Sequence, residues 1–183
     1  MGHTLIAVFD NELRRLIFES GIIANNKIPF RTDCDRESVN RLLPYHVTLF
    51  HWASQQDILY LRKMDKVQFQ PCSVKVDSAG IMQGSLYSYV LYLKVSPDRG
   101  FEALCSNIEE ATGRPVESFL HIIISVSRDQ EAIQAQYKAL SKILRSPIVL
   151  PVKSLELYQV WSPVRRIRTF GLPEPEENES EKG

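Results

Sequence analysis

Two histidines lie at matching places in two β-rich stretches of the chain. Residues 43–50 (LPYHVTLF) contain His46, and residues 119–127 (FLHIIISVS) contain His121. Because side chains alternate across a strand, His46 and Thr48 share one face of the first stretch. Two imidazoles suit acid–base chemistry, since a pKa of about 6.5 lets one be neutral and the other charged near neutral pH. A nearby hydroxyl can donate a hydrogen bond to a phosphate oxygen.

The second strand is predicted to have the same plan. Alternation puts Ile123 and Ser125 on the face of His121. Ser125 would then offer a hydroxyl about 6.8 Å beyond the position of Ile123. The opposite face is apolar and suits a core: Leu120, Ile122, Ile124 and Val126.

The other predicted elements repeat in order around these two strands. Each half reads strand, helix, histidine strand, helix, strand, with one helix starting at Ser96-Pro97 and ending at Gly113, and another running from about Asp129. Residues 166–170 are expected to pair with an extended segment before them. This order predicts one α+β domain over residues 1–170, built from two pseudo-symmetric lobes (about 1–80 and 81–170). Antiparallel sheets would line a central cleft, with helices outside.

Motif, order, spacing and length together resemble the 2H phosphoesterase superfamily, which includes RNA 2′,3′-cyclic phosphodiesterases and bacterial 2′-5′ RNA ligase-like proteins. Residues 46–50 (HVTLF) match the first family motif in full, and His121 matches the histidine of the second. Ile123 stands where the family has Thr or Ser. The resemblance covers roughly residues 4–170.

The resemblance implies a phosphodiesterase that needs no metal or other cofactor and hydrolyses a 2′,3′-cyclic or 2′-5′ phosphodiester on RNA or a nucleotide. His46 and His121 would be its catalytic acid and base, in an order that the residues leave open. Thr48 and Ser125 would bind the phosphate, and Tyr158 would stack a base. The alternative is a nucleotide- or RNA-end-binding protein of the same fold with weak or no turnover, because Ile123 brings no hydroxyl. With both histidines present, a slow enzyme is the favoured interpretation.

Each of these residues also has a purely structural interpretation. A lone histidine on a strand is more often a core or surface residue than a catalyst, and the duplicated frame is what favours catalysis here. Thr48 is also a β-forming residue. Two further sets of residues are expected to play structural roles. A packing role on a strand is expected for Tyr87, Tyr89 and Tyr92. A solvated edge strand is expected to contain Arg165, Arg166 and Arg168.

Charge and cysteine content limit the class of partner. Lys+Arg and Asp+Glu number 22 each, but the tail 171–183, predicted to be disordered, holds five Glu and one Lys, which leaves 21 basic and 17 acidic residues elsewhere. A mildly basic body suits an RNA end or a nucleotide with a cyclic phosphate more than a long duplex. Three dispersed cysteines favour a reducing compartment. No apolar run reaches the roughly 20 residues that a membrane helix needs, so the protein is not expected to enter a membrane. The N-terminus lacks a signal-peptide pattern, which favours a cytoplasmic protein. The protein is also expected to be a monomer.

Overall fold

The structure is a computed structural model that describes residues 2–9, 11–19, 21, 45–53, 57–84, 88–159 and 165–171. The predicted tail 171–183 lies outside this part, except for Gly171, which is the last residue of the strand Arg165–Gly171. The described helices are α1 (Asn11–Glu19), α3 (Asp57–Met64), α4 (Arg99–Thr112) and α5 (Gln130–Ile143). The described strands are β1 (Gly2–Phe9), β2 (His46–Ala53), β3 (Ser73–Gln83), β4 (Tyr89–Pro97), β5 (His121–Ser127), β6 (Ile148–Gln159) and β7 (Arg165–Gly171).

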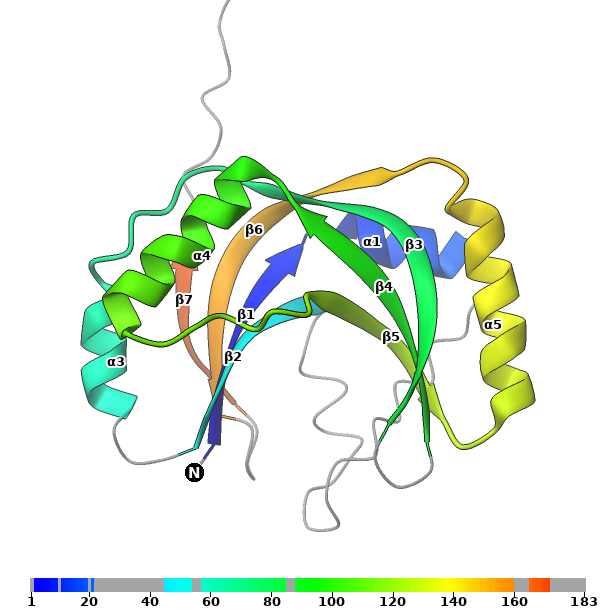
Figure 1. The fold of residues 1–183 in the computed structure, drawn as a ribbon, viewed down its shortest axis with the longest axis horizontal. Coiled ribbons are helices and arrows are strands. Elements are labelled where there is room, and N and C mark those ends of the chain that lie inside the picture. Colours follow the sequence, from blue (N-terminus) through cyan, green and yellow to red (C-terminus); the bar gives the residue numbers. More distant parts are fainter. Residues whose placement is uncertain are drawn as a thin grey trace, which may run out of the picture.

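All seven strands belong to one antiparallel sheet, which makes the fold α+β as predicted (Figure 1). Its order is β1-β2-β5-β4-β3-β6-β7, and β6 also pairs with β1. The pairings therefore run from β1 through β2, β5, β4, β3 and β6 back to β1. The predicted pairing of the last strand with β6 is confirmed. The division into two lobes stays a prediction, and its boundary at residues 80 and 81 falls inside β3.

The local sequence explains where the best-defined helix begins and ends. The carboxylate of Asp98 caps α4 by accepting a hydrogen bond from the backbone N–H of Phe101 at 2.7 Å. Gly113 ends the helix with a φ of 68°, a left-handed conformation that glycine adopts without strain. The end at Gly113 is confirmed. The predicted start at Ser96-Pro97 is wrong, because Pro97 is the last residue of β4.

One face of the sheet packs into a single hydrophobic cluster. In β1, Leu5, Ala7 and Phe9 belong to this cluster, whereas Ile6 and Val8 do not. Each fully buried Leu or Ile stabilises the fold by roughly 1.5–3 kcal/mol. The helices add these buried residues to the same cluster: Leu13, Ile17, Met64, Phe101, Leu104, Ile108, Ile133 and Leu140. In Figure 1, α3 and α4 lie together at one end of the sheet and α5 lies at the other.

Among the helices that the structure describes, none has both the length and the apolar character needed to cross a membrane.

Candidate active site

The two histidine strands are neighbours in the sheet. β2 and β5 pair antiparallel, with Val47 opposite Ile122, and both residues are fully buried in the hydrophobic cluster. Successive residues of a strand point to opposite faces, so the residues on either side of this pair lie on the other face. These four residues are half-buried: His46, Thr48, His121 and Ile123.

The register also sets how far apart the two histidines lie. One step from the Val47–Ile122 pair, His46 falls opposite Ile123 and Thr48 falls opposite His121. The histidines are then diagonal neighbours, whose Cα atoms in such a pair are roughly 7–8 Å apart. Two imidazoles at this separation can contact one phosphate group from two sides. The cleft predicted around them stays a prediction.

A β-bulge interrupts β2 just after its histidine motif. Ile6 lies opposite Thr48, but Leu5 lies opposite Phe50, so Leu49 is an extra residue in the ladder. Beyond the bulge, alternation is reset. Phe50 consequently belongs to the hydrophobic cluster together with Leu49, although alternation would place Phe50 on the face of Thr48.

Two hydrogen bonds hold the bulge of β2 in place. The carbonyl oxygen of Phe50 accepts from the hydroxyl of Thr4 at 2.9 Å. The carbonyl oxygen of Leu49 accepts from the backbone N–H of Glu117 at 3.0 Å. Because Glu117 lies just before β5, the second bond fixes the start of one histidine strand to the other.

β5 carries a bulge at the equivalent position. Tyr92 lies opposite Ile123, but Leu91 lies opposite Ser125, so Ile124 is the extra residue. In both strands the bulged residue is the third after the histidine. The two histidine strands therefore share the same position of the bulge relative to the histidine.

This bulge changes the face on which Ser125 lies. Residues directly opposite each other in a ladder share a face, and Leu91 is a fully buried member of the hydrophobic cluster. Ser125 is accordingly 1% exposed and lies on the core face. The prediction that Ser125 shares the face of His121 is wrong, and nothing in the geometry brings its hydroxyl to the histidines.

Backbone and aromatic contacts fix the ring of His121. Its Nδ1 lies 2.9 Å from the carbonyl oxygen of Phe119. A carbonyl oxygen can only accept, so Nδ1 carries the proton in this bond and Nε2 is the nitrogen left for a ligand. The ring of Phe119 stacks on the imidazole, with centroids 4.9 Å apart, and Tyr92 meets the imidazole edge-on at 5.8 Å. Phe119 was not among the predicted site residues, although it is an aromatic residue two positions before the histidine.

The outer neighbours of the two histidines differ in charge. Across the β4–β5 ladder, His121 faces Lys94, which is exposed. Across the β1–β2 ladder, His46 faces Val8, which is buried. Lys94 was not among the predicted site residues either. Its signal was a single charge inside the apolar segment 89–95 (YVLYLKV).

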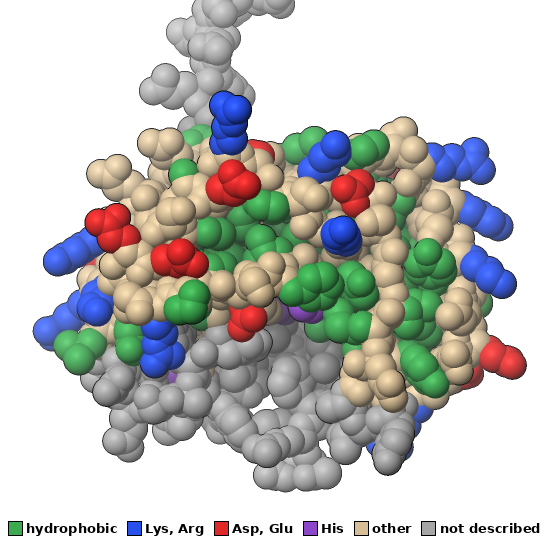
Figure 2. All heavy atoms as spheres, in the orientation of Figure 1, with side chains coloured by type: hydrophobic (Ala, Val, Ile, Leu, Met, Phe, Trp, Pro, Cys, Tyr) green, Lys and Arg blue, Asp and Glu red, His purple; other side chains and the backbone are tan. Residues whose placement is uncertain are grey.

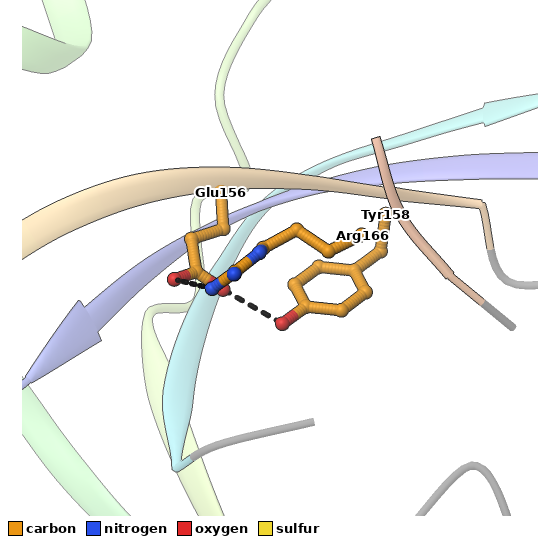
Figure 3. Close-up of polar contacts among 3 residues, drawn as sticks. All are labelled: Glu156, Tyr158 and Arg166. Atoms are coloured by element: carbon orange, nitrogen blue, oxygen red, sulfur yellow. Dashed lines mark hydrogen bonds and ion pairs between the residues drawn. The ribbon is translucent and has the colours of Figure 1, made fainter. Parts of the chain in front are cut away.

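Tyr158 belongs to a polar group in β6 and β7 (Figure 3). Its hydroxyl donates to Glu156 Oε2 at 2.7 Å, and Arg166 Nη1 donates to Glu156 Oε1 at 3.2 Å. Burial, followed by the hydrogen bond to Glu156, raises the pKa of Tyr158 well above its usual value. Tyr158 is 4% exposed. Its predicted role in stacking a base stays a prediction.

Within the described ranges of the chain, no group of three or more His, Cys, Asp or Glu side chains could hold a metal ion.

Comparisons with solved structures identify the overall fold of the chain. No protein-family model and no curated protein matches the sequence. Solved structures do match over nearly the whole chain. E. coli LigT complexed with 3′-AMP shares 14% identity at a TM-score of 0.54, over 94% of this chain and 98% of that chain. The chain has the 2H phosphoesterase fold.

Two more structures with the 2H phosphoesterase fold give similar values. The protein TT0787 of Thermus thermophilus has 16% identity and a TM-score of 0.53, over 94% of this chain and 98% of that chain. Usb1 of Kluyveromyces marxianus has 13% identity and a TM-score of 0.50, over 93% and 97%. At such identities the likeness concerns the 2H fold, and the roles of individual residues rest on the geometry above.

Proposed function

We propose that this chain is a phosphodiesterase that cleaves a 2′,3′-cyclic or 2′-5′ phosphodiester on RNA or a nucleotide, with His46 and His121 as its acid and base. The observation that carries the proposal is the pairing of Val47 with Ile122. This register supports two imidazoles on one face of neighbouring strands. Hydrolysis by in-line displacement needs a base for the attacking water and an acid for the leaving oxygen on opposite sides of phosphorus.

The neighbouring side chains have distinct roles in this proposal. His121 acts through Nε2, because Nδ1 is committed to the carbonyl of Phe119. Thr48 donates its hydroxyl to a non-bridging phosphate oxygen. Lys94 adds positive charge beside His121. Either histidine can be the base, and the two exchange roles when the reaction runs in reverse.

The structural comparisons support a nucleotide as the ligand. LigT, which has this fold, has been crystallised with ATP and with 3′-AMP. The charge distribution also favours a small ligand over a long duplex. On the face shown in Figure 2, Lys and Arg side chains are dispersed, mostly around the margin, and do not form one basic patch.

Ile123 favours a second candidate function. It is half-buried and provides no hydrogen bond to a phosphate at the place that corresponds to Thr48 in the other strand. A protein of this kind could bind a nucleotide or RNA end and turn it over weakly or not at all. Losing one positioned donor typically lowers a rate by about 10²–10³-fold, whereas each acid or base supplies about 10²–10⁴-fold. A slow enzyme is therefore the better candidate.

A substrate panel separates the two functions. The purified chain is incubated with 2′,3′-cyclic nucleotides, 2′-5′ dinucleotides and ADP-ribose cyclic phosphate, and products are separated by chromatography while binding is measured by calorimetry. Turnover of at least one phosphodiester supports the enzyme. Binding without turnover of any compound supports the binding protein. If the chain neither binds nor cleaves any compound of the panel, both functions are contradicted.

A further inference from the structure

Phe119 is an exposed aromatic residue beside a candidate catalytic group. It is 47% exposed, yet its ring stacks on His121 with an interplanar angle of 26°. An exposed phenylalanine leaves apolar surface in contact with water, which burial would remove at a gain of about 25 cal/mol per Å². Its position thus offers a flat apolar surface next to the proposed phosphate site.

Tyr92 holds this surface in a fixed geometry. Its edge meets Phe119 at 5.5 Å between centroids and an angle of 75°, and it meets His121 at 5.8 Å and 80°. Gly80 lies opposite Tyr92 in the β3–β4 ladder, and a Cβ at that glycine would lie 2.5 Å from the tyrosine ring. The missing side chain of Gly80 therefore lets the tyrosine ring lie against β3. The three rings form a cluster before any ligand arrives.

A nucleobase matches the chemistry of this cluster. Every base has a flat π face, and stacking on an aromatic side chain stabilises a bound base whatever its identity. Within a nucleotide, the ribose keeps base and phosphate close together. A base on Phe119 therefore leaves the phosphate beside His121 Nε2, with Lys94 across the ladder.

From these contacts we propose that Phe119, supported by Tyr92, is the platform on which the substrate's base stacks, on the His121 side of the scissile phosphate. The inference rests on the proposed function and adds the residue that binds the base of the substrate. The competing explanation is that Phe119 only orients His121. The two differ in what they predict for a substrate that has a phosphodiester but no base.

Two substrates and three variants test the platform. The substrates are 2′,3′-cyclic AMP and the methyl riboside 2′,3′-cyclic phosphate, which carries no base. Phe119→Leu should raise the KM for cyclic AMP about tenfold, from the loss of one stacked base. It should leave the KM for the baseless substrate within about twofold, and any loss of kcat from a less fixed His121 should be the same for both substrates. Phe119→Trp should retain the wild-type KM, and Phe18→Leu, which changes an exposed residue of α1, is the matched control.

The result that overturns the platform is an equal loss of kcat for both substrates with KM unchanged, because that pattern belongs to a residue that only positions His121. Calorimetry with 3′-AMP and methyl riboside 3-phosphate makes the test independent of turnover. The platform is supported, even if no substrate is cleaved, when the wild type binds 3′-AMP more tightly than methyl riboside 3-phosphate and Phe119→Leu abolishes this difference. Equal affinity for both ligands in the wild type overturns the platform while leaving the phosphodiesterase intact. If the wild type binds neither 3′-AMP nor methyl riboside 3-phosphate, both the platform and the proposed phosphodiesterase are overturned.

Discussion

His121 lies directly across the β4–β5 ladder from Lys94. The corresponding neighbour of His46 is Val8, an apolar residue. The two imidazoles therefore have different electrostatic surroundings although their strands carry bulges at equivalent positions. An ammonium group beside one histidine attracts an anionic phosphate to that side of the site.

Removing this charge should weaken the enzyme. We expect Lys94→Gln to lower kcat/KM for a cyclic nucleotide about tenfold, less than the ~10²–10³-fold typical of a buried, preorganised donor, because Lys94 is exposed. Lys94→Arg should keep most of the activity. Steady-state kinetics at two salt concentrations check this, since salt screens an exposed charge.

The control for this charge is Lys138→Gln, which removes an exposed lysine from α5. That variant should match the wild type. If Lys94→Gln also matched the wild type at low salt, Lys94 would have no part in binding the phosphate.

Ile123 is the position that decides how well the second strand serves the phosphate. Ile123→Thr should preserve or raise turnover of a cyclic nucleotide, while Thr48→Ala should lower it, since each change alters one phosphate donor. The loss of apolar volume at half-buried Ile123 should cost about 1 kcal/mol of stability or less. Initial rates and thermal melting measure both effects.

Two outcomes at this position would change the account. If the wild type binds nucleotides without turnover and Ile123→Thr creates turnover, the binding-protein function is the correct one. If Ile123→Thr abolishes activity in a folded protein, Ile123 shapes a different pocket and the match to the second family motif is wrong.

Much of the fold could be predicted because its signals are local. His46 and His121 each begin a strand, and the carboxylate of Asp129 caps α5 close to its predicted start. The start of α4 was predicted less well, because its cap is Asp98 and not Ser96. The face of Ser125 could not be predicted in this way. Residues 122–124 are three consecutive isoleucines, so no polar side chain marks the point at which the bulge resets alternation.

The site was predictable only in part for a similar reason. The spacing of His46 and Thr48 follows from a single strand. Lys94 reaches His121 only through the cross-strand register, which the local pattern does not encode. Phe119 lies two residues before His121, so alternation favours the same face, but the pattern does not show that the two rings stack.

Hydrolysis should proceed without a divalent cation. Two imidazoles supply both proton transfers, and Thr48 and Lys94 supply electrostatic stabilisation of the phosphate. Activity after dialysis against EDTA should equal the untreated activity. A loss on chelation that zinc or manganese restores would reject this prediction.

Tyr158 should contribute to stability in a pH-dependent way. Tyr158→Phe leaves the buried carboxylate of Glu156 with one fewer donor, which should cost about 1–3 kcal/mol. Because the pKa of Tyr158 is raised in the folded state, the folded protein keeps a proton that the unfolded chain releases above a pH of about 10. The contribution is thus fully present below that pH and declines above it.

Urea denaturation from pH 7 to 11 measures this effect. The free energy of unfolding of the wild type should fall more steeply above pH 10 than that of Tyr158→Phe. Tyr89→Phe is the matched control, because its hydroxyl bonds to Gln130 in an exposed position. Parallel slopes for the wild type and Tyr158→Phe would show that burial of this hydroxyl does not couple to folding.

The most direct test of the account is the hydrolysis of 2′,3′-cyclic AMP by the wild type, His46→Ala and His121→Ala, followed by ³¹P NMR, with circular dichroism to establish that each variant is folded. Each substitution removes one proton-transfer group, so each should lower kcat by at least about 10²-fold. A double variant with both substitutions should have a kcat only slightly below that of the less active single variant, because the two groups act as a unit. Wild-type turnover that survives in either folded single variant would contradict the two-histidine mechanism.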